Sequence, residues 1–287
     1  MDHALYPYSP APERSRLVWP GGARLASCVY LYFEYLEVEP PEGTVRDPRF
    51  HWRPAPDLRQ HSLHEYGVRV GIFRILDLLD RFGVKATVAA NAEACARYPF
   101  LVEAFSARNY EFAAHGNTAS RMITSKMTEP EERTFIADTL ARITRATGKR
   151  PSGWIGQDYS ESTRTPFLLA EAGLNYVADW PNDDQPYRMT VGDGFVSIPN
   201  HAQWDDVQLL WDRRLQPSRY PEIVGAAFDQ LYEEGAHSGR FFSLGIHPWL
   251  TGAPHRIRYL ERALDRIVGR SDVWQCTAGE IAGHLLS

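Results

Sequence analysis

Short apolar runs end in polar or titratable residues at six places in this sequence. The runs and the residues that follow them are Ser27–Phe33 before Glu34, Tyr110–Ala114 before His115, Gly153–Gly156 before Gln157 and Asp158, Tyr176–Ala178 before Asp179, Phe195–Ile198 before His201, and Phe241–Ile246 before His247. One histidine after one strand is more often structural than catalytic. Six such ends together indicate an enzyme site, because parallel strands bring their carboxyl ends to the same edge of a barrel.

Carboxylates and imidazoles that face one another suit general acid–base hydrolysis, or metal-assisted hydrolysis if three of them ligate an ion. The sequence contains no His-x-x-x-His, His-Glu-x-x-His or Asp-x-Asp motif. It also lacks a Gly-x-Ser-x-Gly nucleophile elbow and a phosphate-cradling loop. Cys28 falls in a buried strand and Cys95 in a helix, where cysteines usually pack. Covalent serine or cysteine chemistry is therefore unsupported.

The elements that would position these residues alternate between strand and helix along the whole chain. Apolar periodicity, caps and breakers predict strands over Leu25–Phe33, Lys85–Ala89, Tyr110–Ala114, Gly153–Gly156, Tyr176–Ala178, Phe195–Ile198, Phe241–Ile246 and Val273–Cys276. They predict helices over Tyr66–Phe82, Ala92–Ala107, Thr128–Thr147, Pro166–Ala172, Pro221–Glu234, Pro254–Val268 and Ala278–Leu286. No composition break marks a linker, so we expect a single domain over residues 1–287 with an irregular arm over residues 1–22.

This alternation predicts an α/β fold, a distorted (β/α) barrel of seven or eight strands. An open doubly wound sheet would carry a glycine-rich turn after its first strand. Here that place reads Phe33-Glu34-Tyr35-Leu36-Glu37, which favours the barrel. The connection Tyr35–Glu65 is far longer than usual, and its five prolines argue against a helix. We expect this connection to cover the site.

Bulk properties exclude several partner classes. The chain has 287 residues, a net charge of −5 and a pI near 6.1, which gives no electrostatic footprint for nucleic acid or an anionic membrane. No run approaches the ~18 apolar residues of a membrane span, and no signal pattern opens the chain. Three scattered cysteines imply no disulfide framework. We expect a cytoplasmic protein with a small-molecule substrate.

Four longer motifs carry a family resemblance that covers Leu17 to Leu286. They are Ala114-His-Gly-Asn-Thr118, Thr147-Gly-Lys-Arg-Pro-Ser-Gly-Trp-Ile-Gly156, Tyr176-Val-Ala-Asp-Trp-Pro-Asn-Asp-Asp-Gln-Pro-Tyr187 and Ser243-Leu-Gly-Ile-His-Pro-Trp249. Their order resembles the polysaccharide deacetylase superfamily, the NodB-homology fold, and in particular its branch of allantoinases and cyclic imide hydrolases. The resemblance implies a distorted barrel with its site at the strand carboxyl ends, and a homotetramer.

The departures from the family pattern concern the metal. Metal-dependent deacetylases have paired aspartates after the first strand and His-x-x-x-His after the third. This chain has Glu34 at the first place and Ala119 where the second histidine belongs, so Glu34 and His115 alone would hold a metal weakly. The allantoinase-like branch shares both departures and is thought to hydrolyse cyclic amides without a tightly bound metal. We expect no cofactor, with zinc as the alternative.

The resemblance suggests a role for each candidate residue. Glu34 would be the base on the attacking water, with a pKa raised toward neutrality by its aromatic neighbours. His115 and His247 would polarise the carbonyl and protonate the leaving nitrogen. The expected substrate-binding residues are Trp154, Gln157, Asp158, Asp179, Trp180 and His201. Gln157 and Asp158 replace a positive position of allantoinases. Two other functions stay open: metal-dependent glycan N- or O-deacetylation, and a non-catalytic barrel that binds small molecules.

Overall fold

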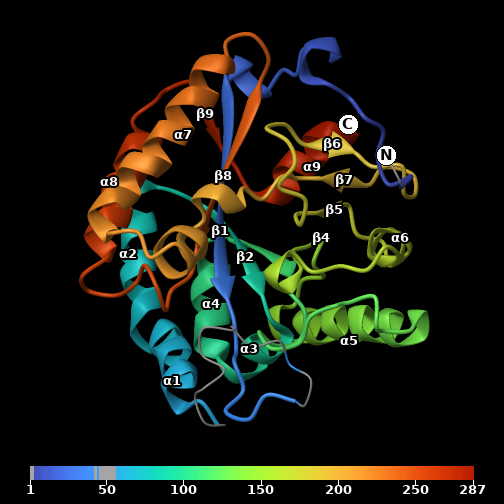
Figure 1. The fold of residues 1–287 in the computed structure, drawn as a ribbon, viewed down its shortest axis with the longest axis vertical. Coiled ribbons are helices and arrows are strands. Elements are labelled where there is room, and N and C mark those ends of the chain that lie inside the picture. The colour runs from blue at the N-terminus through green and yellow to red at the C-terminus, as the bar shows by residue number, and fades with distance from the viewer. Residues whose placement is uncertain (1–2, 42–43, 45–55) are drawn as a thin grey trace.

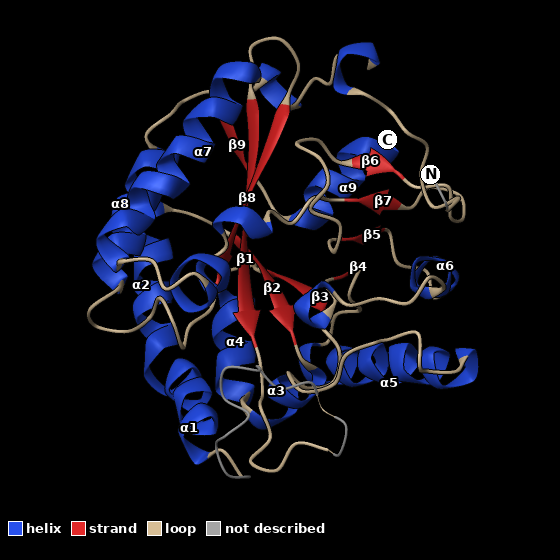
Figure 2. Cartoon of the chain, viewed as in Figure 1, coloured by secondary structure: helices blue, strands red, loops and turns tan. Residues whose placement is uncertain are grey.

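A computed structural model describes residues 3–41, 44 and 56–287, which form one curled sheet with helices packed around its outer side (Figures 1 and 2). The strands are β1 Leu25–Phe33, β2 Ala86–Ala90, β3 Glu111–Ala114, β4 Gly153–Trp154, β5 Tyr176–Val177, β6 Tyr187–Arg188, β7 Val196–Ser197, β8 Arg240–Ile246 and β9 Val273–Gln275. The α-helices are α1 Leu58–Tyr66, α2 Ile72–Phe82, α3 Ala92–Arg97, α4 Pro99–Ala107, α5 Glu129–Thr147, α6 Thr165–Glu171, α7 Tyr220–Glu234, α8 Ile257–Val268 and α9 Ala278–Leu286.

The sheet has the order β6-β7-β5-β4-β3-β2-β1-β8, and β9 pairs with β1 as well. All of its pairings are parallel except that of β6 with β7. The loop that contains Asp184 and Gln185, called the closing loop below, helps to close the curled sheet. Phe241 N–H at the start of β8 donates to the Asp184 carbonyl over 2.8 Å. Gln185 Nε2 donates to the Gly239 carbonyl over 2.6 Å beside it. The predicted α/β fold, a distorted barrel, is confirmed.

The side chains of each strand alternate between two apolar layers, and this alternation determines which face the residues after the strand point to. Along β1, Leu31 and Phe33 pack in the layer shared with the outer helices, whereas Tyr30 and Tyr32 lie in a second layer between strands, α9 and Trp19. Successive side chains of a strand point to opposite faces. Glu34 is therefore expected on the inner face, two residues after Tyr32. The same count places His115 inside, two residues after Ala113.

The N-terminal arm packs along the closing loop and the β6–β7 hairpin of its own domain (Figure 1). Thr190 N–H donates to the Leu5 carbonyl over 2.8 Å, and the Arg14 guanidinium pairs with Asp183 at 2.6 Å. Trp19 Nε1 donates to the Arg240 carbonyl over 2.8 Å. The arm thus covers the barrel seam.

Two predictions about local structure need correction. Leu58–Tyr66 is helix α1, begun by Asp57, whose side chain accepts from Gln60 N–H over 3.1 Å. The prediction that Tyr35–Glu65 holds no helix is therefore wrong for its last part, which lies beyond the five prolines. Residues 42–43 and 45–55 of that connection lie outside the described residues. The predicted helix Tyr66–Phe82 is divided by a π-helical turn over Gly67–Gly71.

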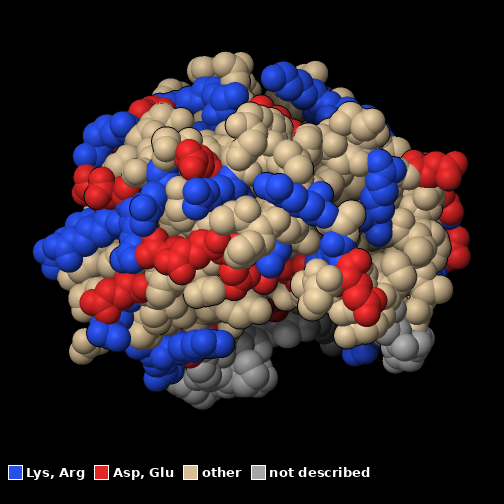
Figure 3. Space-filling model, turned by 90° about the horizontal axis from the view of Figure 1, so that it is seen from above, with Lys and Arg blue, Asp and Glu red and all other residues tan. Residues whose placement is uncertain are grey.

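The distribution of surface charge and the apolarity of the helices agree with the composition of the sequence. On the face shown in Figure 3, basic and acidic side chains are interspersed and form no extended patch of one sign. None of the helices in the described part of the chain combines the length and apolarity that a membrane crossing requires.

Candidate active site

A cavity of about 200 Å³ lies at the carboxyl end of the barrel strands. Its walls bring together five of the predicted site residues, three from positions directly after β1, β3 and β8 and two from the loop after β4. The residues that line it are Tyr32, Glu34, His64, His115, Met122, Gly156, Gln157, Asp158, Tyr159, Asp205, Val207, Gln208, His247 and Trp249.

Glu34 and His115 form one side of this cavity. His115 Nδ1 lies 2.6 Å from the Ile155 carbonyl, which can only accept, so Nδ1 carries a proton. The other nitrogen, Nε2, lies 3.5 Å from Glu34 Oε1, beyond the usual length of a hydrogen bond between these groups. Gln157 Nε2 donates to the same oxygen over 2.8 Å. The imidazole is thus fixed with Nε2 toward the carboxylate.

The predicted rise in the pKa of Glu34 is wrong. Burial raises the pKa of this carboxyl, but the neighbouring His115 and the positive charge of His247 outweigh burial and hold the pKa well below its ordinary value. Glu34 is only 9% exposed. The sequence predicts that the aromatic neighbours Tyr32, Phe33 and Tyr35 control the ionisation of Glu34. The histidines that the fold brings close control it instead, so Glu34 is a carboxylate at neutral pH.

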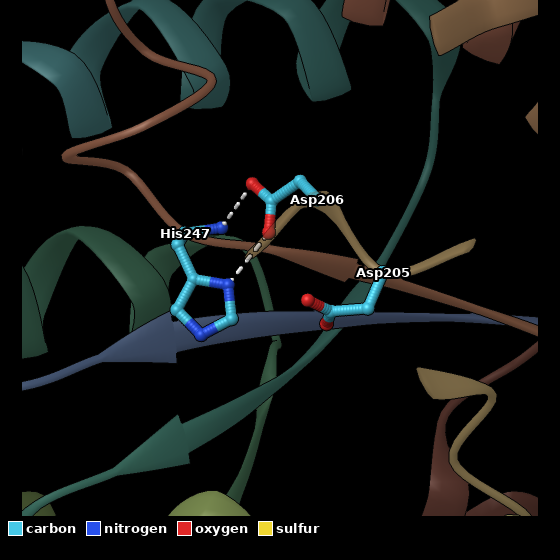
Figure 4. A group of neighbouring side chains, drawn as sticks. All are labelled: Asp205, Asp206 and His247. Carbon is cyan, nitrogen blue, oxygen red and sulfur yellow. Dashed lines mark hydrogen bonds and ion pairs between the residues drawn. The ribbon is translucent and has the colours of Figure 1, made fainter. Parts of the chain in front are cut away.

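His247 also lines the cavity, and it is held by Asp206 (Figure 4). Asp206 Oδ1 accepts from His247 Nδ1 over 2.6 Å, and its Oδ2 accepts from His247 N–H over 2.8 Å and from Thr251 Oγ1 over 2.9 Å. Burial lowers the pKa of His247, but Asp206, by charge and by hydrogen bond, raises it to about 9. The ring stacks on Tyr32 with centroids 3.9 Å apart. At neutral pH His247 is an imidazolium with Nδ1 engaged.

Asp205 lies beside the His247 ring without a bond to it in Figure 4. Its Oδ1 accepts from the backbone N–H of Val207 over 2.8 Å, and no described residue hydrogen-bonds its Oδ2. Burial raises the pKa of Asp205 to about 7. Asp158, which also lines the cavity, has a pKa raised by burial.

Four predicted substrate-binding residues do not line the cavity. Trp154 packs in the outer layer, where its ring centroid lies 6.4 Å from that of Phe135. The next residue, Ile155, lies in the inner layer instead, because successive side chains of a strand point to opposite faces. Asp179 lies behind the loop after β4 and accepts from Gly156 N–H over 2.6 Å. The other two also have partners elsewhere: Trp180 lies against Tyr6 of the arm, and His201 Nδ1 is 2.9 Å from Ser243 Oγ. The pattern of strand ends located these residues but not the face to which they point.

The sequence prediction missed two aspartates and one histidine at the site. Asp205 and Asp206 lie in the loop after β7, beyond the strand end itself. A usable signal was present, because no Lys or Arg accompanies this acidic pair between Arg188 and Arg213. His64 lies on α1, in the segment interpreted as a structureless loop.

Comparison with known proteins identifies the family. The sequence model of the family described as polysaccharide deacetylase matches residues 65–177. The chain is 30% identical over 253 residues to the "Putative polysaccharide deacetylase" of Schizosaccharomyces pombe, covering 80% of this chain and 77% of that protein. This chain belongs to the polysaccharide deacetylase family. It is also 24% identical over 250 residues to the peptidoglycan deacetylase of Helicobacter pylori, covering 76% of this chain and 84% of that protein.

Solved structures of the family share the whole fold. The "probable Polysaccharide deacetylase" from Pseudomonas aeruginosa PAO1 superposes with a TM-score of 0.85 at 29% identity, over 94% of both chains. The Puue allantoinase superposes with a TM-score of 0.83 at 28% identity, over 94% of this chain and 93% of that one. The protein is accordingly a deacetylase- or allantoinase-like hydrolase that acts on carbon–nitrogen bonds.

The metal of the deacetylases does not fit the residues present. The described residues hold one group with three ligand atoms close enough for an ion, Asp205, Asp206 and His247, whose atoms lie within 4.8 Å of one another. Both Asp206 oxygens and His247 Nδ1 are already bonded to one another or to Thr251. Asp206 and His247 Nδ1 bind each other, so this group offers an ion Asp205 and His247 Nε2, whereas a zinc site needs three or four protein ligands. At the family's own position, Ala119 replaces the second histidine.

Proposed function

We propose that this protein hydrolyses a carbon–nitrogen bond of a small cyclic amide, imide or ureide, with Glu34, His115 and His247 as catalytic residues and without a tightly bound metal. One observation carries this proposal: a carboxylate next to an imidazole and a second, protonated imidazole line one small cavity. This arrangement supplies a proton acceptor and a proton donor to one bound group.

Glu34 and His115 would activate the water. A water between Glu34 Oε1 and His115 Nε2 would donate to both, and Nε2 would take its proton as the oxygen attacks the carbonyl carbon. Nε2 can accept because Nδ1 already donates to the Ile155 carbonyl. The Glu34 carboxylate would stabilise the imidazolium that forms, and Gln157 would keep that carboxylate in place.

His247 would serve the other half of the reaction. Its Nε2–H would stabilise the negative oxygen of the tetrahedral intermediate, as a preorganised donor does. When the C–N bond breaks, the proton that His115 took from the water passes to the leaving nitrogen. In a ring, the released nitrogen group and the carboxylate formed remain in one product. Asp206 would keep His247 protonated.

The size and charge of the cavity support a small neutral ring. About 200 Å³ is below the ~300–1,000 Å³ of pockets for drug-sized ligands. Among the described lining residues there is no Lys or Arg to pair with a negative substituent. The likeness to an allantoinase supports a ring substrate, and Gln157 and Asp158 argue for a ring other than an acidic ureide.

The test is a hydrolysis screen of succinimide-, hydantoin- and dihydropyrimidine-type rings beside acetylated chito-oligosaccharides, with metal content measured on the same preparation. Ring opening by metal-free protein is expected. Release of acetate from the oligosaccharides, dependent on a stoichiometric metal, would replace this proposal with the metal-dependent deacetylase. A metal at the Asp205, Asp206 and His247 group would have to displace the hydrogen bond between Asp206 and His247 Nδ1. No turnover on either class would favour the binding barrel.

A further inference from the structure

His64 is a polar residue of the cavity for which the proposed reaction has no use. It lies on α1 and lines the cavity together with Glu34, His115 and His247. Its ring stacks on Trp249, with centroids 4.7 Å apart and planes inclined by 22°. Trp249 in turn lies edge-on to His247, with centroids 6.3 Å apart. His64 therefore belongs to a wall next to the reacting groups.

Backbone packing fixes the position of this imidazole. The π-helical turn Gly67–Gly71 follows α1 directly, and such turns often occur at functional sites. A Cβ on Gly67 would lie 2.7 Å from Trp249 N, and one on Gly71 would lie 2.2 Å from the Pro248 carbonyl oxygen. Only glycine permits this contact, so the helix rests on the turn that follows His247. The ring of His64 is thereby held over Trp249.

The nitrogen atoms of His64 are suited to a neutral polar ligand. No described residue hydrogen-bonds its buried Nδ1, and the same holds for Nε1 of Trp249. Burial lowers the pKa of His64 to about 4, so the imidazole is neutral at neutral pH. A neutral imidazole offers one donor and one acceptor. A buried polar atom without a partner is costly, and a ligand that bonds it removes the cost.

We propose that His64 determines specificity by hydrogen-bonding the non-reacting carbonyl group of a small uncharged cyclic imide. The inference rests on the proposed function, because it names the substrate group that the catalytic residues leave unbound. An imide ring carries a second carbonyl next to its N–H, whereas a simple lactam of the same size does not. His64 would therefore favour imides over lactams.

The test compares the wild type with His64→Phe, which retains an aromatic ring over Trp249 and removes both nitrogens. The kcat/KM ratio of a five-membered imide to the matching lactam should fall about tenfold, the usual effect of losing one such hydrogen bond. The loss should appear in KM for the imide more than in kcat. His237→Phe, at an exposed histidine outside the cavity, should leave the ratio unchanged. An unchanged ratio in His64→Phe, or an equal loss for both substrates, would overturn the inference.

Calorimetric titration of both proteins with the imide separates this inference from the proposed function. If the wild type binds the imide without opening it, and opens no other ring of the hydrolysis screen, the proposed function fails. Weaker binding by His64→Phe would then still support the role of His64, and equal binding would overturn it. If the wild type binds no imide, this inference is overturned, and the proposed function is decided by the other rings of the hydrolysis screen.

Discussion

Replacing Asp206 by Asn tests whether this carboxylate keeps His247 protonated. The pKa of His247 is raised from 6.5 to about 9, with Asp206 as the main raising cause against the opposing effect of burial. Both side chains are buried, at 12% and 0% exposure, so solvent screens the pair little. A pKa difference of this size corresponds to about 3 kcal/mol of folding free energy.

The sign of the pH dependence follows from the direction of the shift. A histidine with a higher pKa in the folded state stabilises the fold while it is protonated. The contribution of His247 is therefore complete below about pH 6.5 and disappears as the pH rises through about 9. Asp206→Asn should cost about 4–6 kcal/mol at pH 6, which includes about 1–3 kcal/mol for bonding partners left unsatisfied. At pH 10 only that smaller cost should remain.

Urea unfolding followed by tryptophan fluorescence at pH 6, 8 and 10 would measure these differences. The matched control is Thr251→Val, which removes the 2.9 Å hydrogen bond to Asp206 Oδ2 and keeps the charge. Its cost should be about 1 kcal/mol at every pH. In nuclear magnetic resonance titrations, the pKa of His247 in Asp206→Asn should fall well below 9, because the main group that opposes burial is then neutral and only Asp205 and Glu34 still raise the pKa. An equal loss of stability at pH 6 and pH 10, or a pKa still near 9, would refute the reasoning.

Three further predictions concern the cavity. Glu34→Gln should lower turnover by ~10²–10⁴. It should also lower the free energy of unfolding at pH 7, because the depressed pKa of Glu34 means that its carboxylate stabilises the fold at neutral pH. Turnover above about a tenth of wild type would contradict the catalytic role of Glu34. Elemental analysis should find well below one equivalent of zinc and chelators should leave activity unchanged, whereas Ala119→His should raise zinc content by restoring the family's histidine spacing; stoichiometric zinc in the wild type would contradict this. Gly156→Ala should reduce kcat at least about tenfold, because a Cβ there would lie 2.7 Å from Asp179 Oδ2 and displace the loop that carries Gln157; unchanged kinetics would show that this loop does not position the site.

The sequence by itself determined the fold and the places where chemistry would lie. Apolar runs that end in polar residues gave the parallel strands, and with them the barrel and the edge at which Glu34, His115 and His247 meet. Such patterns are local, since each depends on a few neighbouring residues and on the two-residue period of a strand. Helix α1 was missed because five prolines precede it in the segment that contains it. The π-helical turn lies inside the predicted helix Tyr66–Phe82, whose apolar spacing does not distinguish it from an α-helix.

Only the tertiary structure decided which strand-end residues face the cavity and how they ionise. β1 is buried on both faces, so its sequence gives no alternation from which the side of Glu34 could be read. The pKa of Glu34 depends on His115 and His247, and that of His247 depends on Asp206, which lies 41 residues away in the chain. Electrostatic interactions depend on distance in space. The charge state of this site was therefore fixed only when the folded chain brought these groups together.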